Sequence, residues 1–506
     1  MTQSVSGREG RTVAALDLGS NSFHMVVARW AGGGLHVVDK LRERVALAAG
    51  LDAKRRLDAE TQQRAIACLE RFGQRLREMP GDSVRAVGTN TLRQLRDGSD
   101  FVERAARALG HEIEIISGKE EARLIYLGVA HDVAHDAGSH GGRRLVVDIG
   151  GGSTECIIGE DLEVLECDSL YMGCVSYSTR YFAEGRLSRR RMEKARLAAR
   201  RELESIRRRY GAVGWDHAIG SSGTILAVER ILVAEGWSER HITARALRKL
   251  RKRLQNGGRV GELSLAGLSE ERRDVIAGGV AVLSGVFDSL GIEVMETSQH
   301  ALREGLLYDL LGRIEHADLR DHTVRQLQLQ YHVDREQAAR VERAAISLLG
   351  EVAKGWGLEG ATERKMLAWA ARIHEAGLSI ARSGYHRHGA YIVAHSDLPG
   401  FSREDQQTLA ALVRGHRRRI RTELFEGLAR PRRKTALRLA VLLRVARRLC
   451  RSRGAHPPLP VEVTASGSTI ALRFDDGWLD EHPLTGADLE EEAALLRDAG
   501  ITLSVR

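Results

Sequence analysis

The feature that most constrains this fold is a short turn pattern that occurs twice in the chain. In VAALDLGSNSFHMVVAR an apolar run ends in Asp17, passes through glycine, serine and asparagine, and then becomes apolar again. LVVDIGGGSTECIIG repeats this order further along, and the same number of residues separates Asp17 from Asp148 and Ser22 from Ser153. Such a repeat predicts two related half-domains, each with a strand–turn–strand hairpin, that face each other across a cleft.

Short apolar strands and amphipathic helices alternate around these hairpins up to about residue 310. This alternation predicts an α/β architecture in which helices cover the sheets. We expect strands around Val13–Leu16, Val84–Val87, Ile113–Ile116 and Leu145–Val147, and helices around Ala59–Glu78 and Leu187–Tyr210.

The pattern changes from Arg335 onwards to long helical periods, which predict a separate all-helical domain. Helices are expected at Gln337–Trp356, Thr362–Glu375 and Arg403–Arg418. After the proline-rich His456–Pro460, the alternations VEVTAS and TIALRF predict a small β-containing module. A chain of 506 residues is long enough for several domains. We expect four, at residues 1–135, 136–313, 314–455 and 456–506.

The two hairpin turns have a composition that suits phosphate. Small residues let a ligand approach the backbone N–H groups, and hydroxyl and amide side chains add donors without bulk. A carboxylate beside phosphate makes sense chiefly when a hard cation such as Mg²⁺ lies between them, so Asp17 and Asp148 are candidate metal ligands. A single turn of this kind is more often a plain hairpin, and it is the duplication that favours function. The added donors are Ser20, Asn21, Ser22, Ser153 and Thr154.

Two further strand-to-helix junctions are candidates for anion binding. Gly220–Thr224 in AIGSSGTILAVERIL opens a helix, which suits an anion or an ordinary capped loop equally well. In AVGTNTLRQLRDG the cation Arg93 lies in a first helical turn, where cations are disfavoured. We therefore expect Arg93 to be directed at an anion in the cleft.

The segment IISGKEEARLIYLGV offers a candidate general base. A strand ends at Ser117–Gly118, and the helix that follows begins with Lys119, Glu120 and Glu121. The simpler interpretation is an acidic pair that stabilises a helix N-terminus. Alternatively, one of the two glutamates activates water for attack on phosphorus, and the pattern alone does not choose between them.

Charge and cysteine content narrow the possible partners. The chain has a formal charge of +9, and residues 414–454 hold fifteen Arg and Lys against Glu423 and Glu426. This basic run suits a polyanion or is only a solvated helical face.

Five scattered cysteines predict reduced thiols and a cytoplasmic protein, not a disulfide framework. No apolar stretch reaches the roughly 18–20 residues of a membrane span, and Met1 to Gly10 lacks a signal-peptide core.

Several segments occur in an order typical of one enzyme family: DLGSNSFHM, GTNTLR, SGKEEARLIYLGV, DIGGGSTE, GSSGT and ERRDVIAGG. With HEAGLSIARSGYHRHGAYIVAHSDLPGF in the helical part, they resemble the exopolyphosphatase and guanosine pentaphosphate phosphohydrolase family over nearly the whole chain. The resemblance implies two actin-like (ribonuclease H-like) lobes around a cleft, then an all-helical HD-like domain and a small C-terminal α+β module. It further implies Mg²⁺-dependent hydrolysis of terminal phosphate from inorganic polyphosphate.

The resemblance also implies roles for individual residues. Glu121 becomes the general base, while Asp148 and Glu155 act on the metal and the water, with Asp17 as the symmetric partner. The terminal phosphates are expected at Ser20, Asn21, Ser22, Arg93, Gly151, Gly152, Ser153, Thr154 and Arg272.

The helical domain resembles the histidine-aspartate phosphohydrolase fold with an altered metal motif. The expected His-Asp pair is His374-Glu375, and Gln337–Leu349 contains no histidine, although His386, His388 and His395 are available. We therefore expect a basic scaffold for the tail of a polyanion here, in preference to independent metal chemistry.

Three alternatives to exopolyphosphatase activity remain open. The substrate could be guanosine pentaphosphate, hydrolysed to the tetraphosphate. An ATP-dependent kinase of the actin-like superfamily is compatible with GSSGT. A basic nucleic-acid-binding protein on an inactive phosphatase core is disfavoured by the acids at positions 17, 121, 148 and 155, so no dedicated nucleic-acid partner is expected. The resemblance suggests a homodimer.

Overall fold

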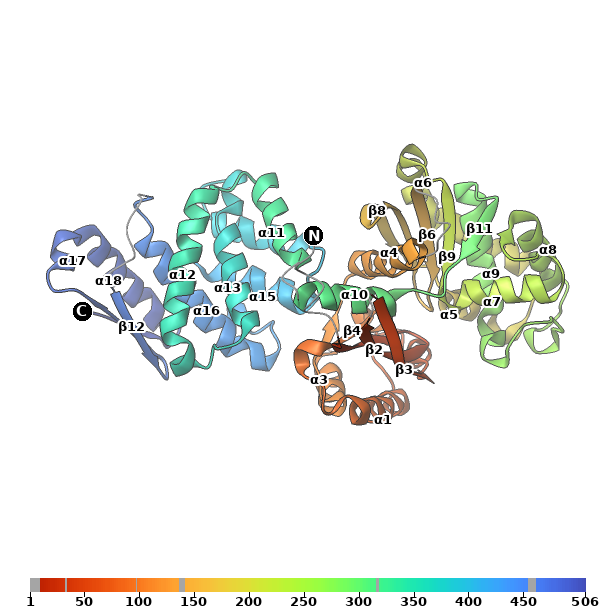
Figure 1. The fold of residues 1–506 in the computed structure, drawn as a ribbon, viewed down its shortest axis with the longest axis horizontal. Coiled ribbons are helices and arrows are strands. Elements are labelled where there is room, and N and C mark those ends of the chain that lie inside the picture. Colours follow the sequence, from red (N-terminus) through yellow and green to blue (C-terminus); the bar gives the residue numbers. More distant parts are fainter. Residues whose placement is uncertain (1–9, 32–33, 97, 136–141, 315–317, 454–460) are drawn as a thin grey trace. The chain divides into compact units, whose positions relative to one another are not determined.

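The computed structural model describes residues 10–31, 34–96, 98–135, 142–314, 318–453 and 461–506. The chain forms two compact units, Met1–Ala317 and Asp318–Arg506, which run from red to green and from cyan to blue in Figure 1. The finer division into four parts stays a prediction. Its boundaries at 135/136 and 455/456, and the proline-rich His456–Pro460, border or lie on segments outside the described residues.

The first sheet has the order β3-β2-β1-β4-β5. Its first three strands are antiparallel neighbours, whereas β4 and β5 run parallel to β1. The hairpin of β1 and β2 carries the first copy of the repeated turn. The strands are β1 Thr12–Leu18, β2 Ser22–Ala31, β3 Gly34–Arg44, β4 Val84–Gly88 and β5 Ile113–Ile115.

The second sheet has the order β10-β11-β9-β6-β7-β8 and repeats the topology of the first, with β10 added at one edge. The hairpin of β6 and β7 occupies the place that β1 and β2 hold in the first sheet. The repeat in the sequence is therefore a repeat of fold. The strands are β6 Arg143–Ile149, β7 Thr154–Glu160, β8 Glu163–Leu170, β9 His217–Ser221, β10 Ile242–Thr243 and β11 Val294–Thr297.

Helices cover both sheets and also separate them (Figure 1). On the outer face of the first sheet, α1 (Ala59–Leu76) and α3 (Ser99–Leu109) share a core with β1. Between the sheets lie α4 (Gly118–His135) and α10 (Leu302–Ile314), whose apolar side chains contact inner residues of both. Because β1 and β6 are buried on both faces, they are nearly continuous apolar runs up to their aspartates.

The other face of the second sheet is covered by five helices that share one core with it. The longest of them, α6, matches the helix expected around Leu187–Tyr210. Their bounds are α5 Cys174–Tyr181, α6 Arg189–Val213, α7 Ser222–Ala234, α8 Ala244–Gln255 and α9 Glu270–Leu290.

The second unit is mainly helical, as the sequence predicted. Helix α15 ends at Gly415, three residues before the expected end, and Arg418 has a left-handed φ of 62°. A non-glycine residue in that region cannot continue a right-handed helix. The helices are α11 Leu319–Gln330, α12 Arg335–Trp356, α13 Ala361–Ile373, α14 Tyr385–His395, α15 Arg403–Gly415 and α16 Arg430–Leu449.

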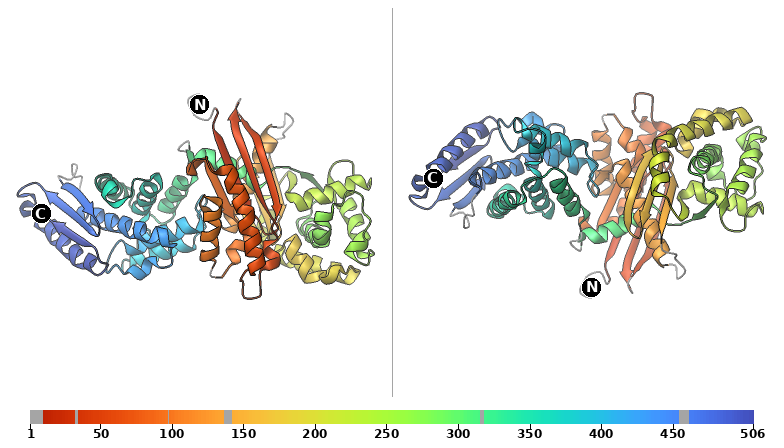
Figure 2. Two further views of the ribbon diagram at one scale, coloured as in Figure 1. Left: turned by 90° about the horizontal axis from the view of Figure 1, so that it is seen from below. Right: turned by 90° about the horizontal axis from the view of Figure 1, so that it is seen from above.

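The C-terminal strands do not have a core of their own. Strands β12 (Val461–Ser466), β13 (Thr469–Phe474) and β14 (Thr502–Val505) form a small sheet beside α18 (Pro483–Arg497), in blue in Figure 2. Their buried side chains belong to the same hydrophobic cluster as those of α12 and α16. In the described part of the chain, no helix is long and apolar enough to cross a membrane.

Candidate active site

The two repeated turns lie against each other in the first unit. A Cβ atom added at Gly151 would lie 3.1 Å from Cβ of Ser20 and 3.7 Å from the backbone N of Asn21. One added at Gly152 would lie 2.6 Å from Oδ1 of Asn90, at the start of the short helix α2 (Asn90–Gln94). Glycine is therefore needed where the turn of one sheet approaches the other sheet closely.

Each hairpin places an aspartate one residue before the end of its first strand. Asp17 pairs across its hairpin with His24, and Asp148 pairs with Glu155. Ser221, at the end of β9, donates a hydrogen bond from Oγ to Oδ2 of Asp148. The second hairpin therefore presents two neighbouring carboxyl groups, and the first hairpin presents one.

Glu155 is held from a third strand. Its side chain is buried, and Ser169 on β8 donates a hydrogen bond of 2.8 Å from Oγ to Oε1. This contact fixes the orientation of the carboxyl group, so Ser169 is a positioning residue that the sequence patterns did not single out.

Burial and neighbouring carboxylates raise the pKa values of three acids of the site, Asp17, Asp148 and Glu155. Burial raises the pKa of Asp17 to about 7, and the nearby Glu121 and Asp148 add to the rise, while Arg303 opposes it. Burial likewise raises the pKa of Asp148 to about 6, against the hydrogen bond from Ser221. Burial, Glu121 and Asp148 together raise the pKa of Glu155 well above its ordinary value. The site therefore holds more negative charge than its protein surroundings neutralise.

Glu121 and Glu120, which the sequence left as alternatives, have different surroundings. Glu121 accepts a 2.6 Å hydrogen bond at Oε2 from Nη1 of Arg93, which also donates to the carbonyl oxygen of Ile116. The electrostatic influence of Glu121 on Asp17 and Asp148 places it within the acidic site.

Glu120 is part of a buried ion network. Arg123 donates to both of its carboxylate oxygens at 2.8 Å, and Nη2 of Arg85 lies 3.9 Å away. Asp309 on α10 pairs with both arginines. These contacts tie α4 to the first sheet and to α10, so the carboxylate of Glu120 has a structural use.

Arg272 reaches the site from the first turn of α9. A Cβ atom at Gly223, in the GSSGT turn, would lie only 1.9 Å from Nη2 of Arg272. The guanidinium group therefore packs directly against this glycine. Its charge lowers the pKa values of both Asp148 and His24. The structure thus brings the third glycine-rich turn, through Arg272, to the same site as the hairpins.

Not every predicted phosphate ligand offers its side chain. The hydroxyl of Thr154 is buried and donates to the carbonyl oxygen of Met172 at 2.5 Å. Ser20, Ser22 and Ser153 are buried, and Nδ2 of Asn21 lies 3.5 Å from Oγ of Ser22. The hydroxyl of Thr154 is therefore already hydrogen-bonded within the protein.

Three residues near Asp17 were missed by the sequence patterns. Arg303, at the start of α10, lies 3.2 Å from His24 through Nη1 and Nδ1. Burial, together with arginines that include Arg303, lowers the pKa of His24 to about 3, so its ring is neutral. The adjacent Glu304 has a buried Oε1 that no described group hydrogen-bonds. An Arg-Glu pair in a first helical turn carries no specific signal in a sequence, and only the packing of α10 between the sheets brings it here.

The donor set fits a hard cation that is shared with a phosphate. Oδ1 of Asp17 is buried and has no hydrogen-bond partner among the described residues. Across the described residues, however, no three His, Cys, Asp or Glu side chains converge closely enough to hold a metal alone. Mg²⁺ typically takes one or two carboxylates and completes its shell with water and phosphate oxygens, so this arrangement agrees with a site that substrate completes.

Two sheets of matching topology, each with an aspartate-bearing hairpin at a shared site, define the actin-like class, and the predicted fold is confirmed. The sequence profile of the Ppx/GppA phosphatase family matches residues 26–314, and that of its domain III matches residues 319–493. The chain belongs to the Ppx/GppA phosphatase family, which comprises hydrolases of phosphoric anhydrides.

Two relatives that cover nearly all of this chain share one name. The guanosine-5′-triphosphate,3′-diphosphate pyrophosphatase of Aeromonas hydrophila is 41% identical over 481 residues, which are 95% of each chain. The Vibrio cholerae protein of the same name is 39% identical over 514 residues, covering 100% of this chain and 99% of that protein.

Solved structures resemble part of the chain. An exopolyphosphatase from Cytophaga hutchinsonii has a TM-score of 0.54 at 24% identity and covers 60% of this chain and 98% of its own. An exopolyphosphatase-like protein matches with the same TM-score and coverage at 26% identity. The first of these likenesses supports the fold alone.

Proposed function

We propose that this protein is a guanosine pentaphosphate phosphohydrolase, which removes the terminal 5′ phosphate of guanosine 5′-triphosphate,3′-diphosphate. The observation that carries this proposal is the name shared by relatives that are 38–41% identical and cover 95–100% of the chain. Structures named for exopolyphosphatase are more distant and cover only 60% of it. The comparisons thus favour the alternative over the polyphosphate substrate that the sequence analysis placed first.

Inorganic polyphosphate is the second candidate substrate. It is supported by family membership and by the exopolyphosphatase-like structural relative at 26% identity. Both substrates end in a phosphoric anhydride, and a site that grips only the terminal phosphates accepts either one. The choice between them therefore depends on groups outside the two hairpin turns.

Phosphate binding is assigned to the two turns and two arginines. In the proposal, the turns at Ser20–Ser22 and Gly151–Ser153 supply backbone N–H groups and small hydroxyls, which bind anions without crowding them. Arg93 and Arg272 supply positive charge, which in phosphoryl transfer stabilises the oxygens of the transferred group.

Glu121 is the proposed general base. Glu120 is held by Arg123 in a buried network, whereas Glu121 lies among the acids of the site. In the proposed step, Glu121 accepts a proton as water attacks the terminal phosphorus. The bond from that phosphorus to the bridging oxygen breaks, and the products are orthophosphate and guanosine tetraphosphate.

Mg²⁺ is the proposed cofactor, held by Asp17, Asp148 and Glu155 together with the substrate. The uncompensated negative charge and the orphaned Oδ1 of Asp17 support this assignment. When bound, the cation would neutralise charge on the phosphate oxygens.

Phosphate release from the purified chain tests the proposal directly. We expect a higher kcat/KM on guanosine pentaphosphate than on long-chain polyphosphate, Mg²⁺ dependence on both, and release without any acceptor. Dependence on an acceptor would instead favour the actin-like kinase, and duplex binding without hydrolysis would favour a nucleic-acid-binding protein. The proposed homodimer is checked on the same sample by sedimentation.

A further inference from the structure

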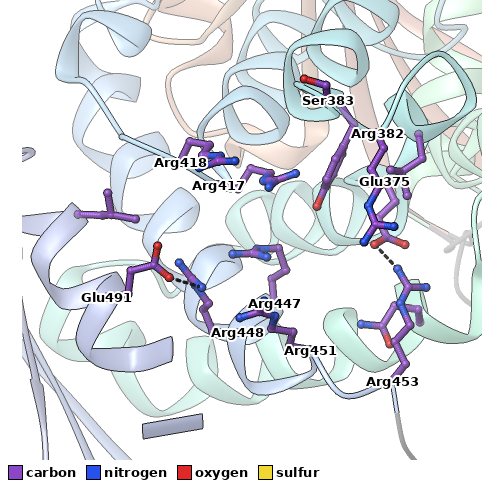
Figure 3. Close-up of a pocket in the computed structure, with 14 residues that line it drawn as sticks. Glu375, Arg382, Ser383, Arg417, Arg418, Arg447, Arg448, Arg451, Arg453 and Glu491 are labelled. Carbon is purple, nitrogen blue, oxygen red and sulfur yellow. Dashed lines mark hydrogen bonds and ion pairs between the residues drawn. The ribbon is translucent and has the colours of Figure 1, made fainter. Parts of the chain in front are cut away.

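The second unit contains a cavity of about 990 Å³ that is unusually rich in arginine. It lies where the loop before α14, the loop after α15, the end of α16 and helix α18 come together (Figure 3). All of its lining residues come from this unit, so the cavity is complete without the active site described above. Seven arginines and two glutamates line it.

Three of the lining arginines are neutralised by acids. Arg453 pairs with Glu375, Arg448 pairs with Glu491 at 3.0 Å, and Arg451 pairs with an aspartate of α18. The first two pairs are the dashed contacts in Figure 3. These contacts use both glutamates of the lining, so the remaining arginines have no acid of the cavity left to balance them.

Four arginines carry the excess charge: Arg382, Arg417, Arg418 and Arg447. Among the described residues, none of them has an ion pair with a carboxylate. Arg417 stacks over the ring of Tyr385, with Cζ 4.6 Å from the ring centroid. Nε of Arg447 is buried and has no hydrogen-bond partner in the described structure. A buried guanidinium N–H without an acceptor is costly, which points to a ligand that accepts from it.

The backbone that presents two of these arginines is held in an unusual conformation. Arg418 has a left-handed φ of 62°, which costs free energy in a non-glycine residue. The buried Arg444 offsets this cost by donating to the carbonyl oxygens of Gly415 and Arg418, both at 2.6 Å. Arg444 is itself paired with the buried Glu492. This support turns Arg417 and Arg418 towards the cavity.

The residues beneath the cavity do not supply the missing negative charge. His374, His386 and His416 are buried there, and burial together with nearby arginines lowers the pKa of each, to about 4 for His386. Neutral rings neither repel nor balance the arginines. A cation is unsuited to this place because Glu375, the acid of the altered His-Asp pair, is already bound by Arg453.

Two arginines of the basic run outside the cavity are held by other groups. Arg432 pairs with Asp405 at 2.7 Å, and Arg433 donates to the carbonyl oxygens of Leu428 and Glu426. These two side chains therefore do not add to the excess charge of the cavity.

We propose that this cavity binds a small anion with two or more phosphate groups. Four arginines without acidic partners match several negative charges, and planar guanidinium groups bind phosphate through paired hydrogen bonds. The volume suits a nucleotide-sized molecule. This site is additional to the hydrolytic one and does not depend on which substrate the first unit cleaves.

Binding stoichiometry tests the proposal in the full-length chain. Glu121→Gln is used as the background to prevent hydrolysis, and calorimetric titrations use inorganic tripolyphosphate and, separately, guanosine tetraphosphate. We expect a binding site that Arg417→Ala with Arg447→Ala removes, or weakens by about tenfold or more. If this variant loses binding of both ligands, the site recognises phosphate alone. If it loses binding of the nucleotide only, the base or sugar also contributes to recognition.

Matched controls separate this site from general electrostatics and from misfolding. Arg421→Ala with Arg430→Ala removes the same charge from exposed positions in the same basic run and should leave both sites intact. Arg382→Ala changes only an exposed residue of the lining and should also weaken the site while the melting temperature stays unchanged. The absence of any binding site that the cavity pair weakens, or equal weakening by the cavity and control pairs, overturns the proposal.

Discussion

Arg93 and Glu121 form an ion pair, with Nη1 of the arginine 2.6 Å from Oε2 of the glutamate, across two helices of the first unit. The sequence analysis gave these residues separate roles, as a phosphate ligand and as a base. In the proposed mechanism, this guanidinium orients Glu121 in the free protein and shares its charge with the phosphate when substrate binds. The two residues should therefore act as a unit.

A double-mutant cycle measures this coupling. Arg93→Ala should raise KM and lower kcat, because it removes both a phosphate contact and the group that orients Glu121. Combined with Glu121→Gln, it should lower kcat little further than Glu121→Gln alone, since residues that act together are not additive. Strictly additive losses in kcat would contradict a shared role.

Substituting Glu120 and Glu121 one at a time distinguishes a catalytic role from a structural role. Glu121→Gln should lower kcat by about 10²–10⁴-fold with little change in KM, as expected for loss of a general base. Glu120→Gln weakens the buried contacts to Arg123 and should lower the free energy of unfolding by about 1.5–3 kcal/mol, while leaving most of kcat. Steady-state kinetics and urea unfolding check both; the reverse pattern would make Glu120 the base.

Gly223→Ala tests whether Arg272 must lie over the GSSGT turn. The new methyl group would overlap Nη2 of Arg272, so the guanidinium must move away. We expect KM to rise about tenfold, because a displaced charge loses its aligned phosphate contact. Thermal stability should not fall, since Gly223 is in a helix and alanine favours that conformation. In an Arg272→Ala background the substitution should have little further effect on KM.

The pH dependence of activity should follow the acids of the site. The pKa values of Asp17 and Asp148 are raised to about 7 and about 6, so below these values the carboxyl groups are protonated and hold a cation poorly. Activity at fixed Mg²⁺ should therefore rise between about pH 6 and pH 8. Higher Mg²⁺ should move the midpoint to lower pH, because the cation competes with the proton. A midpoint that does not change with Mg²⁺ concentration would show that Asp17 and Asp148 do not bind the metal.

Asp17→Asn should stabilise the metal-free chain at high pH. The folded-state pKa of Asp17, about 7, lies above its ordinary value of 3.8, so the folded chain binds this proton more tightly than the unfolded chain. The contribution of Asp17 to stability therefore falls as pH rises from about 4 to 7 and stays low above that. Melting curves should show the variant a few degrees more stable at pH 8 and nearly equal to the original at pH 4. Excess Mg²⁺ should stabilise the original chain more than the variant.

Much of the fold could be predicted because its signals are local. An apolar run that ends in an aspartate and a small-residue turn gives a hairpin wherever it occurs, so its duplication predicted the two matching sheets. The end of α15 could not be predicted, because the left-handed Arg418 depends on hydrogen bonds from Arg444 in a different helix.

The residue types of the site were also visible in the sequence, and their contacts were not. Asp17 and Asp148 follow from the turn motifs and Glu155 from the family resemblance, whereas Ser169, Arg303 and the arginine cavity have no motif. The sequence by itself determined the two hairpins and their acids, since backbone conformation at a short turn depends on adjacent residues. Only the tertiary structure decided that Glu120 is buried in an ion network while Glu121 faces the acids, because the difference lies in partners contributed by distant helices and strands.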